Sequence, residues 1–74
     1  MDQKKKLSVV IAHWIEHNES HRGEYKKWGQ TAGAMGLDSV KAEIEEAIQR
    51  ISEANLHLAK AKKVLLETNL PRMC

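Results

Sequence analysis

The sequence lacks several features that stabilise or localise other small proteins. Cys74 is the only cysteine among its 74 residues, so no disulfide forms within the chain. A single thiol at the end of a chain is typical of a reducing compartment, and we expect a cytoplasmic protein. Phenylalanine is absent and proline occurs once, at Pro71. No apolar run is long enough for a membrane span, because His13 interrupts the segment LSVVIAHWI.

Neither sign of charge dominates. Twelve Lys and Arg residues oppose ten Asp and Glu residues, which gives a net charge of +2. A nucleic-acid-binding surface would need a stronger excess of positive charge, so we expect no nucleic-acid partner. A single core of this size rarely supplies more than about 3–5 kcal/mol of stability. A bound metal or a second subunit therefore remains as the source of further stability.

Apolar residues recur at helical spacing in both halves of the chain. They predict an all-α antiparallel hairpin with a helix over about 4–32, a turn at 33–37 and a helix over 38–67. Glycines in the first half predict a kink or break between Gly23 and Gly36, and Gly36 suits a left-handed helix end. Asn69 and Pro71 are expected to end the second helix. The predicted seam contains the polar residues Asn18 and His21, and its other positions are Leu7, Ile11, Trp14, Tyr25, Trp28, Ala32, Met35, Val40, Ile44, Ala47, Ile51, Ala54, Leu58, Ala61 and Leu65.

This seam also predicts which residues face one another. It pairs Trp14 with Leu58, Asn18 with Ala54, and Trp28 with Ile44. A two-helix hairpin leaves apolar surface open, so we expect a homodimer that forms a four-helix bundle.

The segment HWIEHNESH places three of the four histidines four residues apart. Histidines at this spacing share one helix face and reach one ion. In the predicted hairpin, His13, His17, Glu53 and His57 converge as a ligand set, with His21 or Glu24 as further ligands. Imidazole and carboxylate ligands suit nickel or zinc. The alternative is a metal-free interaction module in which His21 packs in the seam and Asn18 fixes the helix register.

An enzymatic function is not expected. HWIEH fits the peptidase pattern H-x-x-E-H, with His13 and His17 as ligands and Glu16 as base. A small metallohydrolase would need a substrate cleft, which two helices do not provide. Metal storage, delivery or sensing is the function expected.

The segment AHWIEHNESHRGEYKKW, followed by a helix rich in Glu and Ala, resembles a family of small uncharacterised prokaryotic helical domains. The resemblance covers residues 7–66 and rests on an HWIEHN..H opening. Some members of that family are joined to small nickel-binding accessory proteins. The resemblance therefore implies metal handling, with nickel as the ion and a metal-accessory protein as a partner. The residues that carry it are His13, Trp14, His17, Asn18, His21 and Trp28.

Overall fold

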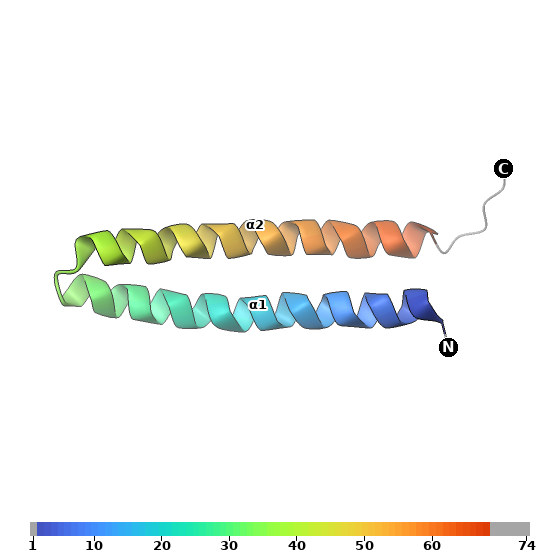
Figure 1. Ribbon diagram of the computed structural model, residues 1–74, viewed down its shortest axis with the longest axis horizontal. Helices are drawn as coiled ribbons and strands as arrows, with labels where there is room; N and C mark the ends of the chain where they lie inside the picture. The colour runs from blue at the N-terminus through green and yellow to red at the C-terminus, as the bar shows by residue number, and fades with distance from the viewer. Residues whose placement is uncertain (1, 69–74) are drawn as a thin grey trace.

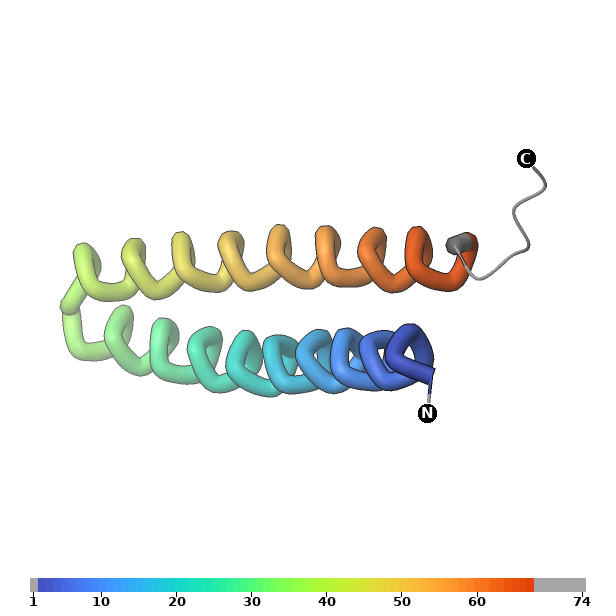
Figure 2. Tube along the Cα trace, turned by 45° about the vertical axis from the view of Figure 1, so that its right-hand side comes forward, coloured from blue at the N-terminus to red at the C-terminus, as the bar shows by residue number. Residues whose placement is uncertain are grey.

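The computed structural model describes residues 2–68, which form two antiparallel helices. Helix α1 spans Gln3–Ala34 and helix α2 spans Asp38–Thr68. The helices lie side by side along their length, and the chain begins α1 and finishes α2 at the same end (Figures 1 and 2). The predicted all-helical hairpin is confirmed. Asn69, Pro71 and Cys74 lie outside the described residues.

The ends of the helices follow from local residues. The side chain of Asp2 caps α1 by accepting a hydrogen bond of 3.0 Å from the backbone N–H of Lys4. At the turn, Gly36 has a φ angle of +76°, which confirms the left-handed conformation expected there. The N–H of Leu37 donates to the carbonyl of Ala32 at 2.9 Å and closes the turn. Glycine thus reverses the chain with no side chain in the way.

The break predicted between Gly23 and Gly36 is wrong, because α1 continues unbroken to Ala34. Tertiary packing explains why Gly29 is accommodated within the helix. A Cβ atom at Gly29 would lie 3.3 Å from Cγ2 of Ile44, so the missing side chain lets α2 approach closely. Contact with α2 therefore offsets the cost of about 1 kcal/mol that glycine carries in a helix.

The predicted seam is only partly correct. Ile11 and Ala32 are buried, and Ile44, Ile51, Leu58 and Leu65 are half-buried, as expected. Trp14 and Trp28 were predicted to face α2, but they are 47% and 62% exposed. The face of α1 that meets α2 is instead formed by Ile11, Ile15, Asn18, Arg22 and Gly29.

The observed pairing is offset by one residue from the prediction. Asn18 meets Asn55 rather than Ala54, and Ile44 meets Gly29 rather than Trp28. One residue corresponds to about 100° around a helix axis. This rotation turns the two tryptophans out of the interface between the helices.

Polar side chains hold the middle of the hairpin. Asn55 is only 8% exposed, and its Oδ1 accepts a hydrogen bond of 2.9 Å from Nδ2 of Asn18. Its own Nδ2 donates to Glu19 at 3.0 Å and to the carbonyl of Ile15 at 3.4 Å. Next to this layer, Arg22 donates to the hydroxyl of Ser52 at 2.9 Å. Directional bonds of this kind fix the register of two helices.

The apolar core of the single hairpin is small. Within the described residues, the buried apolar side chains are Ile11 and Ala32. No helix in this part of the chain is long and apolar enough to cross a membrane. The four-helix bundle predicted from the sequence would require a second copy, and it stays a prediction.

Candidate functional site

The first feature of interest is a row of imidazoles on α1, which we call the histidine ladder: His13, His17 and His21. The rings of His13 and His17 are stacked with their centroids 6.2 Å apart. The rings of His17 and His21 meet edge to face at 4.5 Å. Because residues four apart share a face of a helix, the three rings form one continuous row.

The ladder ends at Glu24 and Tyr25. Nδ1 of His21 lies 3.2 Å from a carboxylate oxygen of Glu24, and its ring lies 6.2 Å from that of Tyr25. His13 and His17 are exposed and His21 is half-buried. Within residues 2–68, none of the three forms a hydrogen bond or ring contact with α2.

The other two predicted ligands lie on α2 in different surroundings. His57 lines an apolar groove of about 470 Å³ near the open end of the hairpin, together with Leu7, Ile11 and Ala61. Glu53 accepts a hydrogen bond of 3.1 Å from Arg50, which also pairs with Glu46. The hydrogen bond that Arg50 donates to Glu53 and the negative charge of Glu46 raise the pKa of Arg50 above its ordinary value.

The predicted convergence of His13, His17, Glu53 and His57 within one chain is therefore wrong. Among residues 2–68, no three His, Asp or Glu side chains lie close enough together to hold an ion. The physical reason is the orientation of each helix. His17 lies about 100° around α1 from Asn18, and His57 about 200° around α2 from Asn55, so both turn away from the interface that these asparagines mark.

The paired asparagines are the feature that the predicted seam missed. Asn18 stood in the predicted seam, but Asn55 did not. A second seven-residue row on α2, Ile48, Asn55 and Lys62, would have indicated it. All three of these side chains are at least half-buried in the structure.

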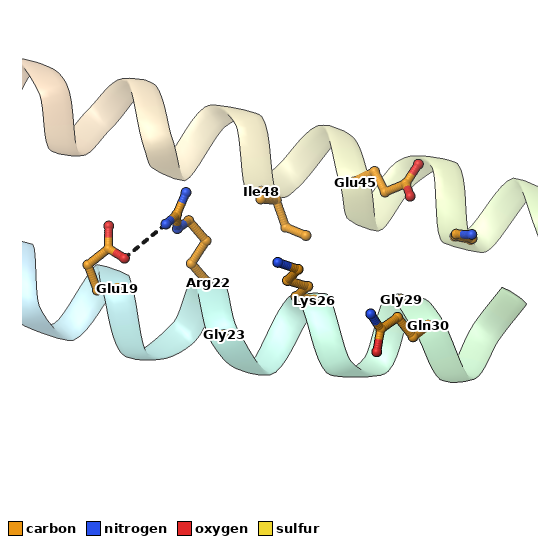
Figure 3. A pocket seen from close by; sticks show the side chains of 9 residues that line it. Glu19, Arg22, Gly23, Lys26, Gly29, Gln30, Glu45 and Ile48 are labelled. Carbon is orange, nitrogen blue, oxygen red and sulfur yellow. Dashed lines mark hydrogen bonds and ion pairs between the residues drawn. The ribbon is translucent and has the colours of Figure 1, made fainter.

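A second groove lies on the flank of the hairpin away from the ladder. It has a volume of about 510 Å³, and its walls include Arg22, Lys26, Gln30 and Glu45. Figure 3 shows Arg22 and Lys26 reaching from α1 towards α2 and Ile48 reaching back. Arg22 also forms an ion pair of 3.1 Å with Glu19. These side chains are polar, and Arg22 bridges the two helices through its hydrogen bond to Ser52, so this flank is suited to water.

Comparison with known proteins adds one match. No curated protein and no solved structure is similar to this chain. One family model, described as a domain of unknown function, matches residues 7–65, which include the ladder, the turn and most of α2. Its description assigns no metal and no activity. The chain belongs to the DUF8180 domain family.

Proposed function

We propose that this protein binds a transition-metal ion, nickel or zinc, through the histidine ladder, and that it stores, delivers or senses the ion. The observation that carries this proposal is the ladder itself. Three imidazoles lie in ring contact along a face of α1 that takes no part in the hydrogen bonds between the helices.

The ladder is not needed to fix the hairpin. The alternative function requires the histidines to act as packing and register residues. In the structure that task belongs to Asn18 with Asn55 and to Arg22 with Ser52. His21 was expected in the seam, but its hydrogen bond is to Glu24 of its own helix. The contacts between the helices do not depend on these histidines, and metal binding would give them a function.

The chemistry of the ladder suits an ion that is exchanged. Neighbouring imidazoles on one helix face offer two nitrogen ligands, at about 2.0–2.1 Å from a zinc ion. A structural zinc site holds four protein ligands, so a pair leaves positions for water or for another protein. An accessible, incomplete ligand set favours transfer of the ion over permanent binding.

Calorimetric titration with nickel and zinc chloride at pH 7.5 tests the proposal. We expect saturable binding that His17→Ala lowers at least tenfold, because His17 contacts both other rings. Glu16→Ala is the matched control, since it changes the adjacent exposed residue and leaves the ladder intact. Binding that survives His17→Ala unchanged would refute the proposal.

A second function, the metal-free interaction module, is favoured by a different observation. Large apolar side chains are exposed along α1, among them the two tryptophans, Trp14 and Trp28. Thermal unfolding in excess chelator separates the two functions. An unchanged melting temperature, together with no heat of metal binding, would favour the module.

A further inference from the structure

One flank of the hairpin carries a raised row of large side chains, which we call the ridge. Its members lie seven residues apart on α1: Leu7, Trp14, His21, Trp28 and Met35. A seven-residue repeat keeps side chains on one side of a helix over its whole length. Leu7, Trp14, Trp28 and Met35 are between 45% and 66% exposed, so this row is uncovered in the single chain.

The same flank of α2 carries side chains that are smaller than those of the ridge, and we call this row the trough. Its members also lie seven residues apart: Val40, Ala47, Ala54 and Ala61. Ala54 and Ala61 are exposed, and Ala47 is half-buried. Ala61 lines the same groove as Leu7, so the two rows belong to one flank.

The ridge and the trough lie level with one another. Arg22 is level with Ser52 and Asn18 with Asn55. By this register Trp28 lies about level with Ala47, His21 with Ala54, and Trp14 with Ala61. The flank therefore presents large side chains on α1 and small side chains beside them on α2. Each large side chain lies within about two residues, measured along the helix axis, of a small one.

We infer that a second copy of this chain docks on this flank, about a two-fold axis parallel to the helices. That rotation places the ridge of each copy over the trough of the other, so Trp28 faces Ala47 and Trp14 faces Ala61. A two-fold axis that crosses the helices in the plane of the flank would set ridge against ridge. Large side chains over small ones give the close packing that protein interiors require.

The size of the flank agrees with this occupant. Each helix is about 48 Å long at 1.5 Å per residue, and two adjacent helices are together about 20 Å wide. The face therefore measures about 960 Å². A stable interface buries about 800 Å² on each partner. The flank is complementary to itself, so two copies can cover each other without any further partner.

The same rotation completes the metal site, and this step rests on the proposed function. In one chain, His17 and His57 lie nearly level, but His17 lies on this flank of α1 and His57 lies on the outer side of α2. In the dimer, α2 of the second copy lies over α1 of the first. His57 of that copy then comes level with His17 at the outer edge of the interface. Each ion would be bound by His17, by a neighbouring ladder histidine and by His57 of the second copy, with two ions per dimer.

Mixing two variants that are each expected not to bind nickel tests this shared site. His17→Ala and His57→Ala each remove an exposed side chain, so both proteins should keep the fold. Each variant alone is expected to lose nickel binding. After subunit exchange, about half of the dimers contain one chain of each kind, and one of their two sites is intact. Equilibrium dialysis should then recover about a quarter of the nickel bound by the wild-type protein.

The other outcomes overturn specific steps. A mixture that has exchanged subunits but recovers no nickel binding overturns the shared site. Sedimentation of the wild-type protein then separates the steps. A two-chain mass in chelator, without metal binding in any form, supports the docking and refutes the proposed function. Stoichiometric nickel binding at a one-chain mass supports the proposed function and overturns the dimer.

Discussion

The two flanks of the hairpin have opposite characters. On one flank, Arg22, Lys26 and Glu45 line the groove between the helices with charge. On the other, Trp14 and Trp28 are exposed beside alanines. Both flanks are built from the same two helices, and the polar layer of Asn18 and Asn55 separates them.

The difference shows which surface of the hairpin is complete. Charged side chains on the first flank are already solvated, and Arg22 is satisfied by Glu19 and Ser52. Exposed tryptophans on the second gain free energy when they are covered, since burial of an aromatic side chain is worth about 1.5–3 kcal/mol. The single chain buries few apolar side chains of its own. The free energy gained by covering the tryptophans therefore matters for its stability.

The largest effect is expected from a charge placed on the ridge. Trp28→Glu should convert the dimer to single chains, because each interface would bury two carboxylates. Loss of a central tryptophan costs an interface about 3 kcal/mol, which raises the dissociation constant about a hundredfold. Analytical ultracentrifugation measures the change. Gln30→Glu, two residues away on the polar flank, is the control and should leave the mass unchanged. Equal effects at the two positions would contradict the difference between the flanks.

Removal of the polar layer is expected to have the next largest effect. Asn55→Ala removes the hydrogen-bond partner of the half-buried Asn18 and one of the two partners of Glu19, which keeps its ion pair with Arg22. Leaving such groups unpaired costs about 1–3 kcal/mol. Urea unfolding followed by circular dichroism should show this loss whether or not metal is present. A loss that appears only with metal would mean that Asn55 serves the metal site.

The metal affinity of the ladder should fall in acid. Ligand imidazoles must be neutral, and free imidazole has a pKa of about 6.5. Each histidine ligand should therefore weaken binding about tenfold for every pH unit below that value, equal to about 1.4 kcal/mol. Nickel titrations at pH 7.5 and 5.5 measure the slope. His17→Ala should reduce this slope, because the site then has one protonatable ligand fewer.

The smallest effects are expected at two glycines. A Cβ atom at Gly23 would meet nothing within 4 Å, so Gly23→Ala should stabilise the protein by about 0.5–1 kcal/mol. Gly29→Ala should gain less or lose stability, because its Cβ would lie 3.3 Å from Ile44. Thermal unfolding of both variants gives the comparison. A larger gain at Gly29 would mean that the close contact with α2 is not a constraint.

Much of the fold could be predicted from the sequence. Periodic apolar residues indicated two helices, and Gly36 indicated the turn. The ladder spacing also follows directly from the helix, as its ring contacts show. The partners across the hairpin could not be predicted reliably. Their pairing depends on a rotation of each helix, and a one-residue change in register turns a side chain by about 100°.

The error in the predicted seam has a physical explanation. On α1 the predicted seam combined two rows of side chains. One row, which includes Ile11 and Asn18, faces α2, and the other is the ridge, which includes Trp14 and Trp28. A helix in a four-helix bundle needs both rows, since it contacts two neighbours. One chain accounts for the first row, and the dimer inferred above would account for the second.

The sequence by itself determined the helices, their turn and the row of three histidines, because each depends on residues within a few positions of one another. Only the tertiary structure decided that Asn18 meets Asn55, that the tryptophans face outwards, and that no three metal-ligating side chains gather within residues 2–68. These outcomes depend on how two helices rotate against each other. That rotation is set by the close contact of Gly29 with Ile44, which is 15 residues away, and by the pairing of Asn18 with Asn55, which is 37 residues away.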